Sequence, residues 1–134
     1  MLFVDANIFL HLVGRDDALR KRCRAGLDSA LLRPNGAAID AEVLQEVLHV
    51  CRRRGRNAEA AKLFDTIVAL GFAVLPIELE TMQLARALCG RHPGLSTRDA
   101  VHAAAIQRAD IREILSFDRG FDAVPGLVRR EPAK

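Results

Sequence analysis

Acidic side chains follow short apolar segments at several points of this chain. Asp5, Asp40 and Asp118 each come directly after a short, mainly apolar segment, and Glu42 and Asp122 stand close behind the second and third of them. Carboxylates that converge on one place repel each other, and folding tolerates this where a cation or bound protons compensate the charge. The spacing therefore predicts an acidic cluster that needs a compensating cation.

Mg²⁺ or Mn²⁺ is the ion that such a cluster suits best. These hard cations take oxygen ligands, need only a few carboxylates, and keep waters that can serve as nucleophiles. Two such ions about 3.5–4 Å apart can hold both the attacking and the leaving oxygen of a phosphodiester. The predicted chemistry is metal-dependent hydrolysis of a phosphate ester.

Each acid also has an ordinary structural role open to it. Asp40 is placed to cap the helix that follows it, Asp99 can complement a helix dipole in a first turn, and Asp118 can cap a short turn. We favour Asp5, Asp99 and Asp118 for the site, whereas for Asp40 the cap is the favoured role. Asp122 is favoured less.

A further acid is expected from the middle of the chain. Glu42 and Glu46 are four residues apart and share one helix face. Glu46 is flanked by Leu44 and Val47, so it lies nearer the buried stripe of this helix and is the favoured site residue. Glu42 remains the alternative.

Other chemistries lack their residues. The sequence contains no dinucleotide, P-loop, serine-hydrolase or zinc-protease motif. The four histidines and three cysteines lack zinc-ligand spacing. Each histidine is expected at the surface or satisfied in the core, His102 included, although it follows Asp99 by three residues on one helix face.

Short apolar segments alternate with helical periodicity along the whole chain, which predicts a three-layer α/β domain with a mostly parallel sheet of about five strands and helices on both faces. Ligands of such sheets bind beyond the carboxyl ends of the strands. The expected strands are residues 2–4, 37–39, 72–75, 114–117 and 127–129. The expected helices are residues 6–13, 16–32, 41–54, 58–70, 78–89 and 98–109, with Asn57 capping the fourth and Ser96 or Thr97 capping the last.

Length and composition limit the remaining possibilities. A chain of 134 residues that is 50% hydrophobic predicts a single domain, residues 1–134, with a core of its own. Three widely spread cysteines, no signal peptide and no membrane-spanning stretch predict a cytoplasmic protein.

Basic residues are clustered rather than scattered. The formal net charge is +3, and one cluster holds four arginines, Arg52, Arg53, Arg54 and Arg56. This cluster is a candidate for holding RNA backbone, and a solvated helix end explains it equally well.

Four segments together resemble the PIN-domain family, and in particular the VapC toxins of type II toxin–antitoxin systems. The resemblance covers about residues 1–130. The segments are Phe3-Val4-Asp5-Ala6-Asn7, Val43-Leu44-Gln45-Glu46-Val47-Leu48, Ser96-Thr97-Arg98-Asp99-Ala100-Val101-His102 and Leu115-Ser116-Phe117-Asp118-Arg119-Gly120-Phe121.

The resemblance implies a Mg²⁺- or Mn²⁺-dependent endoribonuclease that forms a homodimer. It also implies a small antitoxin that inserts a segment into the active-site groove. Matched position by position, Asp5, Glu46, Asp99 and Asp118 form the acidic quartet of the family. The polar residues beside the first and last acids are Asn7 and Ser116.

Two rival functions remain. A catalytically silent PIN-like module that binds RNA or a protein is the first, and the loss of a quartet acid would favour it. An aspartyl-phosphate domain is the second, and it is disfavoured because Asp5-Ala6-Asn7 lacks the second aspartate of the phosphatase pattern.

Overall fold

The computed structural model describes residues 1–134 and has a five-stranded parallel sheet at its centre. The strands are β1 Leu2–Val4, β2 Ala37–Asp40, β3 Ala73–Leu75, β4 Glu113–Leu115 and β5 Val128–Arg130, and their order in the sheet is β3-β2-β1-β4-β5. The helices are α1 Ala6–Leu12, α2 Asp17–Leu31, α3 Ala41–Arg53, α4 Asn57–Ala69, α5 Leu79–Arg91 and α6 Thr97–Arg108, with a 3₁₀ helix, η1, at Arg119–Ala123.

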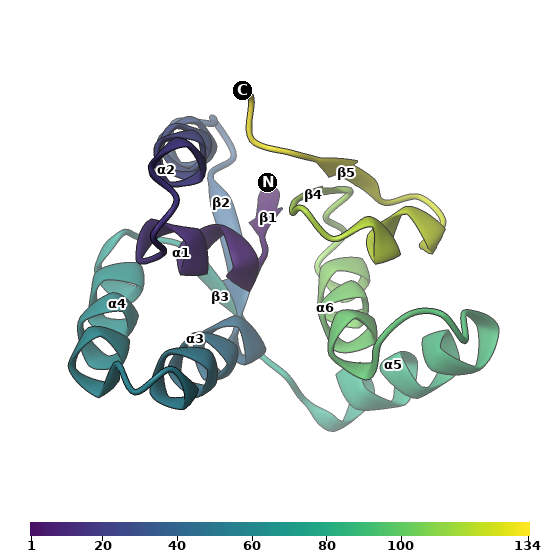
Figure 1. The fold of residues 1–134 in the computed structure, drawn as a ribbon. Coiled ribbons are helices and arrows are strands. Elements are labelled where there is room, and N and C mark those ends of the chain that lie inside the picture. The colour runs from purple at the N-terminus through teal and green to yellow at the C-terminus, as the bar shows by residue number, and fades with distance from the viewer.

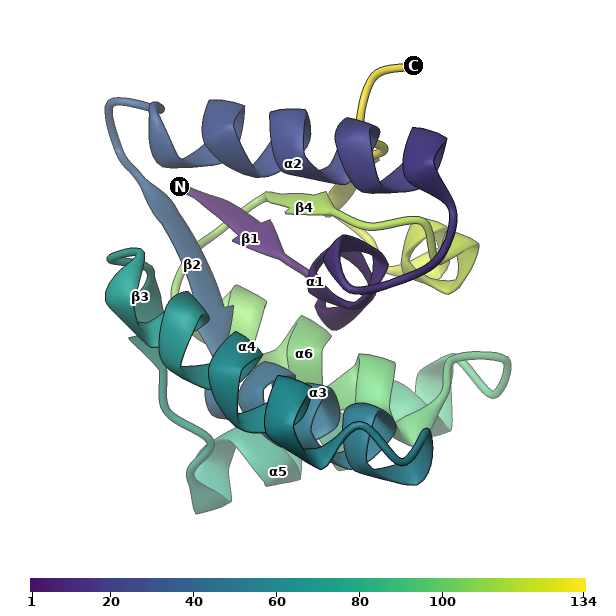
Figure 2. The ribbon, with the colours of Figure 1, turned by 60° about the vertical axis from the view of Figure 1, so that its left-hand side comes forward.

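The helices cover both faces of the sheet, which makes three layers. The chain moves outward from β1 to β3 and then returns past β1 to β4, so right-handed connections place α1–α4 on one face and α5 and α6 on the other. Figure 1 shows this division, with the purple to teal helices on one side of the sheet and the green helices on the other. In Figure 2, α2 runs along one side of β1 and β4, away from α5 and α6. The predicted three-layer α/β fold is confirmed.

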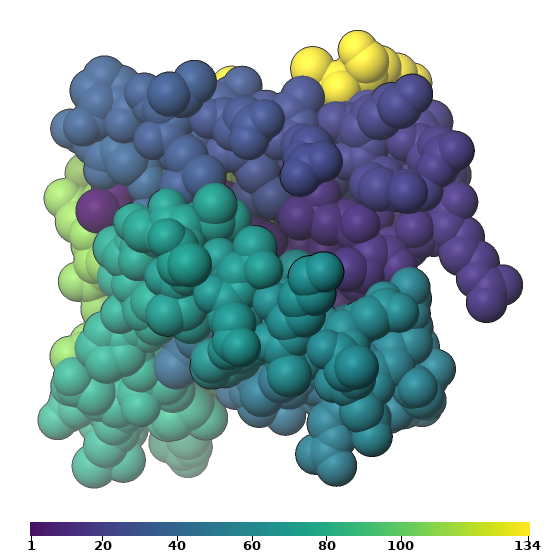
Figure 3. Space-filling model, turned by 90° about the vertical axis from the view of Figure 1, so that its left-hand side faces the viewer, coloured from purple at the N-terminus to yellow at the C-terminus, as the bar shows by residue number.

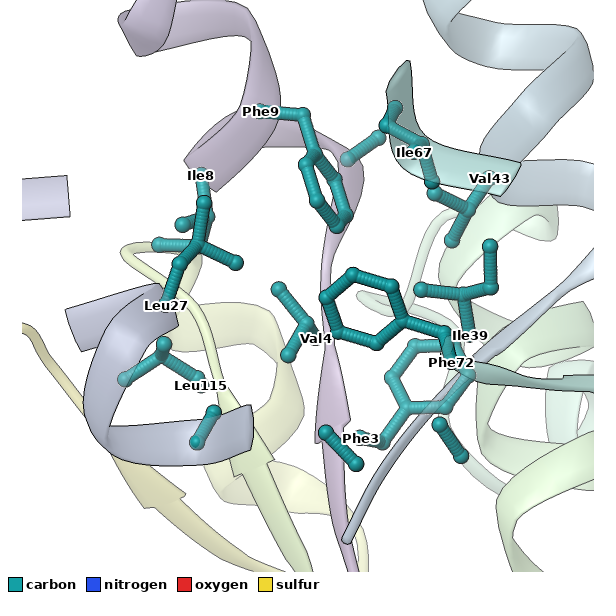
Figure 4. Packing of buried hydrophobic residues seen from close by; sticks show 14 of the residues in the cluster. Phe3, Val4, Ile8, Phe9, Leu27, Ile39, Val43, Ile67, Phe72 and Leu115 are labelled. Carbon is teal, nitrogen blue, oxygen red and sulfur yellow. The ribbon is translucent and has the colours of Figure 1, made fainter. Parts of the chain in front are cut away.

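The central strands β1 and β2 are almost wholly apolar because both faces of the sheet are covered there. Every residue of β1 and β2 is buried, as expected for central parallel strands. The larger core cluster lies between the sheet and the α1–α4 layer, and Figure 4 shows its side chains, including Phe9 of α1 packed edge-on against Phe72 at 5.4 Å between ring centroids. A second cluster joins α5 and α6.

The α1–α4 layer forms a continuous outer face. Figure 3 looks onto this layer, with α2 across one half and the teal residues of α3 and α4 across the other. Gly55, with a φ of +73°, lets the chain turn between α3 and α4, a conformation that favours glycine. None of the helices has the length and apolarity that crossing a membrane requires.

The start of α4 differs from the prediction. Asn57 is the first residue of α4 rather than its cap, and Arg56 holds the cap position without a side-chain cap bond. The Arg56 side chain instead forms an ion pair with Glu59 and donates to the carbonyl oxygen of Val13. The turn itself is held by backbone bonds from Gly55 N–H to Arg52 O and from Arg56 N–H to Cys51 O, both at 2.9 Å.

Candidate functional site

Asp5 and Ser116 meet where the chain reverses its direction across the sheet. They follow β1 and β4, which are neighbours although far apart in sequence, and ligands of such sheets bind at this reversal point. Ser116 Oγ donates to Asp5 Oδ2 at 2.6 Å, and Asn7 Nδ2 donates to the same oxygen at 3.1 Å. The backbone N–H of Ala6 donates to Oδ1 at 2.8 Å. The Asp5 carboxylate is therefore fixed in direction by three donors.

Asp5 is held in a place that disfavours its charge. It is buried, and this burial raises its pKa, although His102 and the hydrogen bond from Ser116 act in the opposite direction. The charge of Glu46 adds to the rise. Carboxyl groups whose pKa is raised by burial cluster at functional sites, which makes Asp5 a candidate site residue.

Asp99 and Asp118 form the second part of the site. Asp99 lies in the first turn of α6, below Ser96, whose Oγ accepts from the Asp99 N–H at 3.1 Å. Asp118 caps η1 by accepting from the N–H of Gly120 at 2.8 Å. A Cβ at Gly120 would stand 3.1 Å from Asp118 Oδ1 and 3.5 Å from Asp99 Oδ2, so a glycine there leaves room for both carboxylates.

The proximity of these carboxylates changes the ionisation of Asp99. Burial raises the pKa of Asp99, the hydrogen bond and charge of Asp118 and the charge of Asp5 raise it further, and it reaches about 7. Near neutral pH the metal-free site therefore keeps a proton that an isolated aspartate would have released. The retained proton follows from the closeness of three carboxyl groups, those of Asp5, Asp99 and Asp118.

Glu46, on α3, is linked to the same region by His102, whose ring lies close to both Glu46 and Asp5. His102 Nε2 lies 3.3 Å from Glu46 Oε1 and 4.0 Å from Asp5 Oδ1, and its Nδ1 lies 2.7 Å from Asp40 Oδ2. Asp40 is also the N-cap of α3, because its Oδ1 accepts from the N–H of Val43 at 2.9 Å. Burial acts to lower the pKa of His102, but the hydrogen bonds to Asp40 and Glu46 outweigh it and raise the pKa to about 10.

The two remaining acids of the sequence analysis lie outside this arrangement. Glu42 is half-buried in the first turn of α3 and takes part in no ion pair or side-chain hydrogen bond. Asp122 is exposed and pairs with Arg129, Oδ1 to Nε at 2.9 Å. Of the two glutamates, the geometry brings Glu46 toward Asp5.

The arginine cluster divides into free and engaged side chains. Arg52 and Arg53 are exposed without an ion pair, and with Gln45 and His49 they line a hollow of about 540 Å³ on α3. Arg54 borders a separate, smaller hollow with Arg53. Arg56 is engaged by Glu59 and Val13. Only part of the predicted cluster is thus available to a ligand as one surface.

The donor set of the acidic site is suited to a hard cation. The carboxylates and the carbonyl oxygen of Asn7 are oxygen donors, and Asn7 Oδ1 is buried without a hydrogen-bond partner. No three acidic, histidine or cysteine side chains are arranged as a ready-made metal cage. Mg²⁺ needs no such cage, because it keeps several waters and takes one or two carboxylates directly. The residues present therefore fit such an ion.

His102 and Asp40 belong to this site more closely than the sequence indicates. His102 is fully buried, which is one of the two places expected for a histidine of this chain, but its partners are acids next to or within the site. Its position one turn after Asp99 was the available signal. The partners themselves, 56 and 62 residues away, leave no local pattern.

Known proteins are similar to this chain in sequence and in fold over almost its whole length. A family model described as PIN domain matches residues 2–127. Ribonuclease VapC13 of Mycobacterium tuberculosis is 40% identical over 129 residues, which are 96% of this chain and 98% of that protein.

Two solved structures have the same arrangement of elements. The crystal structure of M. tuberculosis VapC20, a sarcin–ricin loop cleaving toxin, matches with a TM-score of 0.80 at 20% identity, over 93% of this chain and 95% of that one. VapBC2 from Rickettsia felis, bound to a DNA fragment from its promoter, matches with a TM-score of 0.76 at 14% identity, over 98% of both chains.

Proposed function

The chain belongs to the PIN-domain family and to its VapC ribonucleases, and from that premise we propose that it is a metal-dependent endoribonuclease, the toxin of a VapBC-type pair. The observation that carries the proposal is the shared space of Asp5, Asp99 and Asp118 at the carboxyl edge of the sheet, expressed in the raised pKa of Asp99. Such a cluster costs stability unless a cation compensates it.

We propose that Asp5, Glu46, Asp99 and Asp118 hold Mg²⁺ or Mn²⁺, with Asn7 and Ser116 in support. When bound, such an ion stabilises charge on a phosphate and lowers the pKa of water. Ser116 and Asn7 fix the direction of the Asp5 carboxylate, and Ser116 Oγ also accepts from the Asp118 N–H at 2.9 Å. Ser116 thus ties the first acid of the site to the last.

Asp99 would carry the proton balance of the site. Because the pKa of Asp99 is about 7, its carboxyl group holds a proton in the physiological pH range and releases it when a cation replaces that proton. The Ser96 hydroxyl bonds to the Asp99 N–H, which fixes the start of α6 and so the position of this carboxylate. No side-chain nucleophile is needed in this scheme.

We further propose that Arg52 and Arg53 hold the RNA backbone. On α3, Arg53 lies seven residues after Glu46, which places both on one face about 10 Å apart along the helix axis. His49 lies between them on the same side and lines the same hollow. One RNA strand can therefore pass the acidic site and reach these guanidinium groups.

Two protein partners are also proposed. A small antitoxin would silence the site by inserting a segment at the carboxyl edge of the sheet. The similarity in fold to a toxin–antitoxin complex from Klebsiella pneumoniae, with a TM-score of 0.69 at 20% identity, and to VapBC2 supports such a partner. A homodimer is expected as well. Light scattering on the purified chain of 14.7 kDa tests it, because a monomer and a dimer differ twofold in mass.

The nuclease proposal is tested on total cellular RNA. Purified protein, freed of any partner, is incubated with RNA in Mg²⁺, Mn²⁺ or chelator, and new RNA ends are mapped. Discrete cuts that require metal are expected for the wild type, and none for Asp99→Asn. Asp65→Asn is the matched control, because Asp65 is exposed on α4 and has no ion pair. A folded wild type that makes no cuts in either metal would instead favour a catalytically silent binding module.

A further inference from the structure

His102 is the only histidine that is fully buried, and it stands between two acids from different parts of the chain. Its Nδ1 lies 2.7 Å from Oδ2 of Asp40, at the end of β2, and its Nε2 lies 3.3 Å from Oε1 of Glu46, in α3. The ring packs beside Phe3 at 5.6 Å between centroids. Backbone, burial and both hydrogen bonds therefore hold the ring in one orientation.

The two contacts use both nitrogens of the ring. Each nitrogen faces one carboxylate oxygen within hydrogen-bond distance, and the two nitrogens lie on opposite sides of a planar ring. The ring is therefore a rigid spacer that fixes the distance between the Asp40 and Glu46 carboxylates.

Glu46 has only one other polar neighbour. Arg98 Nε lies 3.6 Å from the same oxygen, Oε1, but the arginine side chain is 45% exposed. An exposed ion pair at this distance restricts a carboxylate weakly. The hydrogen bond to the fully buried ring of His102 is therefore what fixes the direction of the Glu46 side chain, and Oε2 of Glu46 has no hydrogen-bond donor from the protein.

We infer that His102 is a positioning residue for the cation: its Nε2 holds Glu46 Oε1 so that the carboxylate faces Asp5, while its Nδ1 anchors the ring on Asp40. This inference rests on the proposed metal site. Residues that hydrogen-bond to metal ligands fix the direction of those ligands, and their loss typically weakens metal affinity about 10–100-fold. Because Asp40 also caps α3, the same ring sets the start of the helix that carries Glu46.

The alternative is a structural role alone, in which His102 ties α6 to α3 and does nothing for the cation. Both roles predict that replacing the ring lowers stability, since buried carboxylates lose a donor. They differ in which of the two hydrogen bonds matters for metal binding.

Two substitutions separate the hydrogen bonds. The amide nitrogen of asparagine can stand near the position of Nδ1, and that of glutamine near Nε2. His102→Asn then keeps a donor toward Asp40, and His102→Gln keeps one toward Glu46. Titration calorimetry with Mn²⁺ is expected to give a dissociation constant about 10–100-fold weaker for His102→Asn, and a value within about threefold of wild type for His102→Gln.

A third variant completes the test. In a Glu46→Gln background, His102→Asn is expected to change Mn²⁺ affinity little, because the carboxylate that the ring positions is already lost. Equal weakening in the two His102 variants, or none in either, would overturn the positioning role. A wild type that binds no Mn²⁺ would overturn the metal site itself, and this inference with it.

A measurement on the unaltered protein covers the case in which the variants do not fold. In ¹⁵N spectra of the histidine rings, added Mg²⁺ should shift the Nε2 resonance of His102 more than its Nδ1 resonance, because the partner of Nε2 binds the ion. A Nε2 resonance that does not respond while Mg²⁺ binds contradicts the inference.

Discussion

At the scale of single residues, the acids of the site work against the stability of the metal-free fold. Asp5 and Asp99 are buried, and burial raises the pKa of each. Asparagine at either place would remove a charge that the fold must otherwise accommodate. Their presence is understandable if a cation restores the balance, which is why the same two carboxyl groups connect stability with the proposed chemistry.

The pH dependence of the metal-free protein follows from Asp99. Its pKa is about 7 in the folded chain and about 3.9 in an unfolded one, so the folded state holds the extra proton. The contribution of Asp99 to the free energy of unfolding is fully present below about pH 3.9 and is lost as the pH rises through 7. Between pH 5.5 and 7.5 the free energy of unfolding should fall by about 2 kcal/mol on account of Asp99.

Urea unfolding in chelator at the two pH values measures this change. His102 has the same sign, because its folded pKa of about 10 also exceeds its ordinary value. Its contribution is complete below about pH 6.5 and is lost as the pH rises through 10, so it persists in Asp99→Asn. That variant should therefore show a smaller fall than the wild type. Equal falls in the two proteins would mean that Asp99 titrates as an ordinary exposed aspartate.

At the scale of elements, α3 and α6 position the site from opposite faces of the sheet. Asp40 begins α3 and Ser96 begins α6, each through a side-chain oxygen that accepts a backbone N–H. These caps, and the acids that follow strands, were predictable because a cap and a strand end are local patterns.

Contacts between distant elements set the limit of prediction. Arg56 was grouped with its neighbouring arginines, but its contact with Val13 joins α4 to the end of α1 across 43 residues. His102 was expected either at the surface or satisfied in the core, and only the contacts between α6 and the residues of β2 and α3 reveal which acids it meets. The choice of Glu46 over Glu42 as the glutamate facing Asp5 depends on the same packing. Sequence periodicity predicts which residues of a helix share its buried face. It does not predict which residues of other elements pack against that face.

The exposed Arg52 and Arg53 at the carboxyl-terminal end of α3 predict how RNA affinity depends on salt concentration. If Arg52 and Arg53 contact phosphates, replacing both with alanine removes two cations from the RNA interface. The slope of log affinity against log salt for single-stranded RNA should then become less steep by about 1.4, or about 0.7 for each contact. Fluorescence anisotropy in chelator measures this slope without cleavage.

Arg112→Ala is the control, because Arg112 is exposed and stands by Asp110 at the opposite end of the sheet from the acids. Its slope should equal that of the wild type. An unchanged slope in the double variant would mean that these arginines only complement the carboxyl end of the helix.

At the scale of the whole molecule, the site joins all three layers. Glu46 comes from the α1–α4 layer, Asp99 from the α5–α6 layer, and Asp5 follows a central strand of the sheet between them. Asp118 reaches the site from the segment between β4 and η1, where it caps η1. A cation at this point would hold the layers together, and without it their carboxylates repel. Metal binding should therefore stabilise the entire fold and not only a loop.

Thermal unfolding with and without Mn²⁺ tests this coupling. A ligand that binds only the folded state at about 100 times its dissociation constant adds about 2.7 kcal/mol, which for a chain of this size raises the unfolding midpoint by several degrees. Asp99→Asn should lose most of the gain, and Asp65→Asn should keep it. Sodium chloride at equal ionic strength separates binding from screening, because screening alone also relieves repulsion between carboxylates. If sodium chloride raised the midpoint as much as Mn²⁺ does, the acids would form a repulsive cluster without a specific ion, and the three layers would have no cation to join them.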